Sequence, residues 1–92
     1  MKEDLSKRER AEALIEYFAR LSKKHPKEEE YSLGLSLAER WLGLMAVPKP
    51  EAALIEALVK DVEVAEARDD AGSGTIDLSL SIQAWARSFA AR

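Results

Sequence analysis

The first third of the chain carries apolar residues at helical spacing. Neighbours on this stripe are three or four residues apart, while charged residues fill the positions between them. Lys23 and Lys24 stand where cations favour a helix C-terminus, and Pro26 cannot continue a helix. The pattern predicts a helix over 4–24, followed by a charged connector. The stripe consists of Ala11, Leu14, Ile15, Phe18 and Leu21.

The next segment gives two conflicting signals. Residues 31–37 alternate between large apolar and small residues, which is typical of a short strand. Ser36 and Glu39 have the spacing of a capping box, which predicts a helix over 37–46 that ends before the proline-containing turn at 47–50. This helix is apolar nearly all round, as is usual for a helix that is central or covered by a second chain.

Two further helices are predicted in the second half. Residues 51–68 carry an apolar stripe behind Pro50, which favours a first-turn position. A break is expected at the glycines of 72–74. Residues 76–82 alternate once more, but a helix over 77–91 with Asp77 as its N-cap is favoured. That helix would place on one face Leu78, Ile82, Trp85, Ala86 and Phe89.

These elements predict an all-α fold, a compact bundle of about four helices forming one domain over residues 1–92. The alternative is an α+β fold with two short strands near 31–36 and 76–81. Both alternating stretches lead into a tryptophan-bearing segment, 32–41 and 77–85. A duplicated unit would explain this echo, and coincidence in a chain rich in leucine and serine is the competing explanation.

Composition limits the chemistry that this chain can perform. With no cysteine and one histidine among 92 residues, disulfide scaffolds, thiolate metal sites and cysteine nucleophiles are excluded. His25 has no neighbouring partner of a known catalytic motif, and Gly72–Thr75 lacks the lysine of a phosphate-binding loop. The three acids Glu66, Asp69 and Asp70 lack the spacing of a calcium loop. We therefore predict no enzyme activity and no catalytic, cofactor-binding or metal-binding residue.

Charge and hydropathy bear on DNA binding, membrane insertion and cellular location. Residues 37–46 and 51–66 have the lengths of a helix–turn–helix, but 51–70 carries seven acids and two bases, which would repel DNA. The longest apolar run, 33–47, is too short to span a membrane and includes Glu39 and Arg40. Without a secretory leader or cysteine, a cytoplasmic location is expected. The scarcity of amide side chains is a thermophile trend, although a GC-rich coding bias enriches alanine and arginine similarly.

An excess of large apolar residues is the most useful functional signal. Small domains bury only about 60% of their unfolded surface, so part of this set should stay exposed in a monomer. We therefore predict a non-catalytic protein–protein interaction or regulatory module, forming a homodimer or binding another protein. A small nucleic-acid-binding regulator is the first alternative, and a small enzyme or ligand-binding protein the second. The predicted interaction surface comprises Trp41, Leu44, Met45, Trp85 and Phe89.

Overall fold

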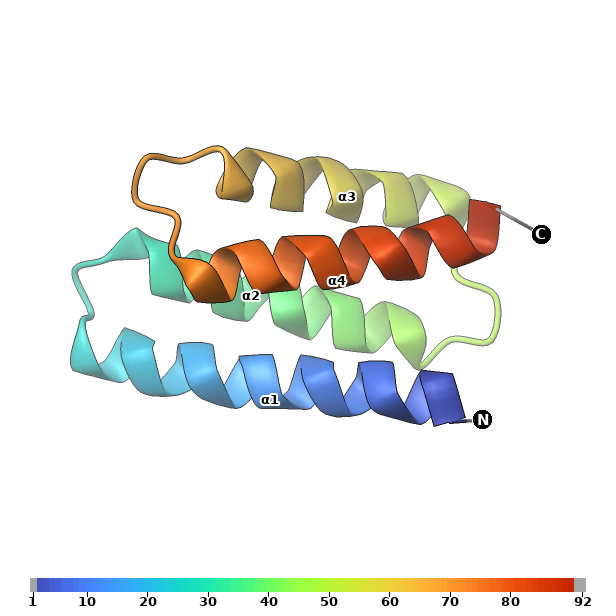
Figure 1. Ribbon diagram of the computed structural model, residues 1–92, viewed down its shortest axis with the longest axis horizontal. Helices are drawn as coiled ribbons and strands as arrows, with labels where there is room; N and C mark the ends of the chain where they lie inside the picture. The colour runs from blue at the N-terminus through green and yellow to red at the C-terminus, as the bar shows by residue number, and fades with distance from the viewer. Residues whose placement is uncertain (1, 91–92) are drawn as a thin grey trace.

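The computed structural model describes the backbone of residues 2–90 and the side chains of residues 7–89. Four α-helices follow one another along the chain, α1 (Lys2–Lys24), α2 (Glu29–Met45), α3 (Ala52–Glu66) and α4 (Ser73–Ala90). Consecutive helices are antiparallel, so α2 and α4 run in the same direction (Figure 1). The predicted all-α bundle is confirmed, and the alternative α+β fold is wrong because 31–36 and 76–81 are helical.

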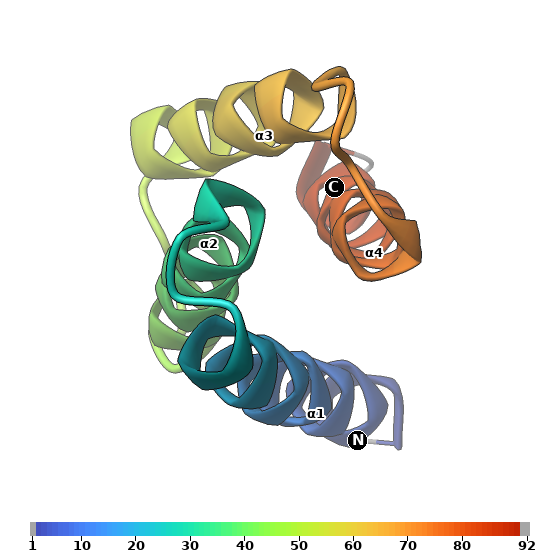
Figure 2. The same ribbon diagram turned by 90° about the vertical axis from the view of Figure 1, so that its left-hand side faces the viewer.

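One hydrophobic core holds the four helices together. The helix α2 lies between α1 and α3, and α4 stands on the opposite side of the core (Figure 2). Every helix contributes at least three side chains to this core, so none of them is a peripheral addition. The buried apolar side chains are Ala11, Leu14, Phe18, Leu37, Ala38, Trp41, Ile55, Leu58, Val62, Ala65, Leu78, Ile82 and Trp85.

The helix α2 begins at Glu29 rather than near residue 37. Ser36 is an exposed residue inside the helix, so the predicted capping box is not formed. The alternating stretch fits a helix because α1 and α3 cover α2 from two sides. A central helix can bury a wide apolar arc, and Tyr31, Leu33 and Leu35 are all partly buried against the core.

The helix α4 also begins earlier than predicted, at Ser73. Asp77 therefore lies one turn inside the helix and is not its N-cap. Its two carboxylate oxygens accept hydrogen bonds from Nη1 of Arg10 at 3.1 and 3.0 Å, which ties α4 to α1. The glycines of 72–74 do not form a long break, because Gly74 belongs to the first turn of the helix.

A glycine allows α1 and α2 to approach each other closely. A Cβ atom at Gly34 would lie 2.4 Å from Cε1 of Phe18, which is far inside van der Waals contact. The Phe18 ring is fully buried and fills the space that a side chain at position 34 would occupy. The two residues therefore form a large-and-small pair at the contact between the helices.

The two helical hairpins place most of their buried residues at one constant spacing. Trp41 and Trp85 are 44 residues apart, and the same spacing relates most other core positions of α1 to α3 and of α2 to α4. Leu37 and Ala65 are exceptions, because the residues at this spacing from them are only partly buried. The two hairpins share the positions that are buried rather than the residue types at those positions, since most pairs differ in type. The pairs in which both members are buried are Ala11 and Ile55, Leu14 and Leu58, Phe18 and Val62, Gly34 and Leu78, Ala38 and Ile82, and Trp41 and Trp85.

Candidate interaction surface

The two tryptophans lie in the core and not on the surface. The exposed fraction is 0% for Trp41 and 5% for Trp85, and their ring centroids are 6.5 Å apart in an edge-on arrangement. The parallel course of α2 and α4 explains this contact, because it brings residues 44 positions apart to the same level. The prediction that both residues belong to an exposed interaction surface is therefore wrong.

The other three predicted surface residues are intermediate in exposure. Leu44, Met45 and Phe89 are partly buried and pack against the core. The Phe89 ring lies 5.0 Å from that of Trp85 and extends the aromatic row toward the C-terminal end of α4. All three residues lie at the end of the bundle where α2 and α4 both finish (Figure 1). They supply an apolar edge rather than a continuous face.

The exposed apolar residues that sequence reasoning missed lie on α4. The side chains of Ile76 and Leu80 are 40% and 57% exposed, and Ala84 is exposed one turn further along. The alternating sequence already contained this signal. Residues two apart point about 200° apart around a helix. Because Leu78 and Ile82 point inward, the apolar residues two positions from them point outward; these are Ile76, Leu80 and Ala84.

This part of α4 forms a nearly uncharged surface, which we call the α4 outer face. Asp77 and Arg87 are the two charged residues in the 18-residue helix, and Asp77 lies at the edge of the face beside Arg10. Elsewhere among the described residues, Leu54 is exposed on α3 beside the small exposed Ala53 and Ala57, whereas Val64 on α3 is exposed with Lys60 and Asp61 one turn before it. Single residues of this kind are ordinary on a protein surface. The α4 outer face consists of Ser73, Ile76, Leu80, Ala84 and Arg87.

An apolar groove runs beside this face, between α3 and α4. Its volume is about 600 Å³, and Ile55, Val59 and Phe89 are among the apolar residues that line it. Glu56, Lys60 and Arg87 line it as well, so charged groups accompany the apolar wall. Arg87 belongs both to the groove and to the α4 outer face, which makes the two surfaces continuous.

A partly buried polar network fixes the rotation of α4 against α3. Oε2 of Glu66 accepts hydrogen bonds from the Ser79 hydroxyl at 2.7 Å and from Nε2 of Gln83 at 3.4 Å. Nε2 of Gln83 also donates to Oγ of Ser79 at 2.8 Å. Because Ser79 is fully buried, turning α4 would leave these groups without partners. The network therefore keeps Ile76 and Leu80 on the outside.

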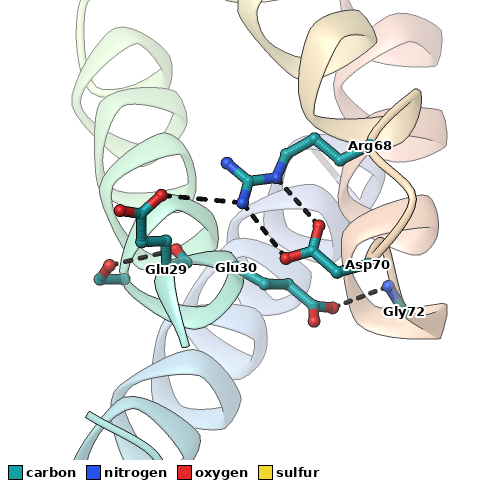
Figure 3. Close-up of polar contacts among 6 residues, drawn as sticks. Glu29, Glu30, Arg68, Asp70 and Gly72 are labelled. Atoms are coloured by element: carbon teal, nitrogen blue, oxygen red, sulfur yellow. Dashed lines mark hydrogen bonds and ion pairs between the residues drawn. The ribbon is translucent and has the colours of Figure 1, made fainter. Parts of the chain in front are cut away.

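A second set of polar contacts fixes the start of α4 (Figure 3). Oε1 of Glu30, in the first turn of α2, accepts a hydrogen bond from the Gly72 backbone amide at 2.7 Å. Nε of Arg68 donates to Asp70 at 2.9 Å, and its guanidinium lies 3.8 Å from Glu29. The hydrogen bond from Arg68 lowers the pKa of the Asp70 carboxyl below its ordinary value. These contacts, which we call the loop clasp, hold the α3–α4 connection against α2.

Other kinds of site find little support in the described part of the chain. Among the side chains that the structure describes, those of residues 7–89, no group of three or more His, Asp or Glu residues is arranged to hold a metal ion. His25 is exposed in the α1–α2 turn, where its ring lies 5.7 Å from that of Tyr31. Within residues 2–90, no helix combines the length and apolar character needed to cross a bilayer. Comparison with known proteins finds no matching family model, no similar curated protein and no similar solved structure.

Proposed function

We propose that this protein is a non-catalytic protein–protein interaction module that self-associates through the α4 outer face. The observation that carries the proposal is the exposure of Ile76 and Leu80 on a helix that is already packed through its opposite side. A helix with apolar residues on both sides typically has a second partner. In the monomer, α4 has neighbours on its inner side alone.

The size of the hydrophobic effect supports this choice of face. Complete burial of one leucine or isoleucine contributes about 1.5–3 kcal/mol relative to exposure. A two-fold dimer would cover Ile76 and Leu80 twice, which supplies several kcal/mol toward the cost of association. The outer side of α1 would instead require the desolvation of exposed charges such as Arg8, Glu12 and Arg20.

Charge argues against a nucleic acid as the partner. The α4 outer face contains Arg87 as its single basic residue, and the neighbouring α3 exposes Glu56, Asp61 and Glu63. Phosphate binding depends on clustered basic residues, and a surface with this balance would repel a polyanion. A protein surface is therefore the partner class that this face suits.

The experiment that tests the proposal compares two glutamate substitutions. Leu80→Glu places a charge on the α4 outer face, while the matched control Val64→Glu places one at a more exposed valine on α3, which is 68% exposed. We expect dimers for the wild type and for Val64→Glu, and monomers for Leu80→Glu, by analytical ultracentrifugation over a wide micromolar range. Circular dichroism should report the same helix content for all three proteins.

Two results would contradict the proposal. A wild-type chain that stays monomeric at the highest concentration would exclude self-association. Equal dimerisation of the Leu80→Glu and wild-type chains would place the contact on a surface other than the α4 outer face.

A further inference from the structure

The α4 outer face is complementary to itself in one particular register. When two helices pair antiparallel about a two-fold axis, residues at the same level have numbers with a constant sum. The sum that places Asp77 at the level of Arg87 in a second copy also places Leu80 at the level of Ala84. Charge complementarity and steric fit thus select the same arrangement.

We propose that the partner on this face is a second copy of the chain, with α4 packed antiparallel against α4 and the two-fold axis at the level of Ile82. This inference rests on the proposed self-association and specifies its geometry. Each Leu80 would pack into the space beside the small Ala84 of the other copy, which suits helices 8–10 Å apart. Each Arg87 would approach Asp77 of the other copy, giving two ion pairs about 15 Å apart along the helix.

Other pairings of the same helix lack this fit. A parallel two-fold pair would set Asp77 against Asp77 and Arg87 against Arg87, and like charges in register oppose association. An antiparallel pair centred on Leu80 would bring Asp77 to the level of Gln83, which leaves the charges without opposite partners. The proposed register is the one of these three that pairs both charges.

The existing contacts of Asp77 are compatible with a second partner. Its carboxylate receives two hydrogen bonds from Nη1 of Arg10 and a longer one, at 3.4 Å, from the Ser81 hydroxyl, and its side chain remains 45% exposed. A carboxylate has about four acceptor sites on its two oxygens, so an approaching guanidinium can still be accommodated. Arg10 holds Asp77 at the edge of the α4 outer face, where Arg87 of a second copy would reach it.

A charge exchange tests the register. Arg87→Glu sets two carboxylates together, and Asp77→Arg sets two guanidinium groups together, so each variant alone should dimerise at least about tenfold more weakly than wild type. An equimolar mixture of the two variants should recover near-wild-type affinity, because each contact in the mixed dimer then joins opposite charges. The matched control Arg20→Glu changes the same charge on the exposed side of α1 and should have little effect.

The absence of cysteine allows a second, independent readout. A short thiol-reactive crosslinker should join Leu80→Cys chains to Ala84→Cys chains more efficiently than it joins either variant to itself. Ser36→Cys, exposed on α2 at the position 44 residues before Leu80, is the control that should not crosslink.

The outcomes separate this inference from the function on which it rests. A dimer that Leu80→Glu disrupts but that neither charge variant weakens would overturn the register and leave self-association standing. Efficient crosslinking of Leu80→Cys to itself would instead favour a parallel pair or an antiparallel pair centred on Leu80. A monomeric wild type would remove both proposals together.

Discussion

The helices α2 and α4 occupy corresponding places in the two hairpins but present opposite chemistry to the surface. On α2 the exposed positions 32 and 36 are serines, while the positions 44 residues later are the exposed Ile76 and Leu80. The difference teaches that a place in the bundle does not fix the character of the outer side of a helix. The outer side of α2 carries small and polar residues, whereas that of α4 is apolar between Ser73 at its start and Arg87 near its end.

The inner sides of the two helices differ in the reverse sense. In α4 the buried residues include Thr75 and Ser79, whereas the corresponding residues of α2 are Tyr31 and Leu35, both packed against the core. Ser79 is satisfied by Glu66 and Gln83, but Oγ1 of Thr75 has no hydrogen-bond partner among the described residues. Nε1 of Trp41 on α2 likewise has none, so each of the two helices buries one unpaired polar atom. The inner side of α4 nevertheless buries two hydroxyl groups at places where α2 has Tyr31 and Leu35.

The largest expected effect comes from giving α2 the side chain that α4 carries at the same place. Gly34 corresponds to Leu78, and Phe18, which fills the space beside Gly34, corresponds to Val62. Gly34→Leu should lower the free energy of unfolding by about 3 kcal/mol, at the upper end for an overpacked core, because the buried Phe18 ring has nowhere to move. Urea denaturation followed by circular dichroism measures this change.

A double substitution separates steric conflict from other effects at this site. Phe18→Val alone should also destabilise the chain, by about 2 kcal/mol, because it leaves a cavity. The double variant Phe18→Val with Gly34→Leu imitates the Val62 and Leu78 pair of the second hairpin. Its loss in free energy of unfolding should therefore be smaller than the sum of the two single losses. Additive losses would mean that the two hairpins use different packing at this level. Gly43→Ala, at an open position of α2, is the control and should stabilise by up to about 1 kcal/mol.

The same comparison explains how far the sequence could be read. Helical spacing predicts the bounds of α1 and α3 to within two residues. An apolar stripe on one side of a helix with charged residues on the other fits a helix and not a strand. The alternating stretches at the starts of α2 and α4 were ambiguous, since the period of two fits a strand and the outcome depended on which neighbours cover each side. The sequence does not reveal that α2 and α4 face each other across the core, and for that reason it wrongly predicts Trp41 and Trp85 at the surface.

A second prediction concerns the two buried hydroxyl groups of α4, which differ in their hydrogen bonding. Ser79→Ala should destabilise the protein by about 1–2 kcal/mol, because Glu66 and Gln83 lose a partner in a partly buried place. Thr75→Val keeps the shape of the side chain and removes an unpaired hydroxyl, so it should be neutral or stabilise by about 1 kcal/mol. Thermal and urea unfolding of the two variants would measure the contrast. Equal losses would imply that Thr75 has a partner in solution, such as a bound water.

The smallest expected effect lies in the loop clasp, where the N-terminal turn of α2 meets the segment that leads into α4 (Figure 3). The hydrogen bond from Arg68 lowers the pKa of Asp70 in the folded chain, so the unfolded chain binds the proton more readily. The resulting stabilisation is fully present above the pKa that Asp70 has in the unfolded chain, and it is lost as pH falls through the lower, folded value. Arg68→Gln removes the charge and should return the Asp70 pKa toward its ordinary value, measured by carboxyl chemical shifts in an NMR titration.

Because Asp70 is exposed and water screens the pair, the stability of the Arg68→Gln chain should differ only slightly from wild type at neutral pH and should fall less steeply on acidification. Lys23→Gln, which removes an exposed charge from the end of α1, is the matched control and should leave the Asp70 pKa unchanged. An Asp70 titration that is identical in wild type and Arg68→Gln would mean that the Arg68–Asp70 contact of the clasp is open in solution, and that the start of α4 is held by the remaining contact of the clasp, from Glu30 to the Gly72 amide.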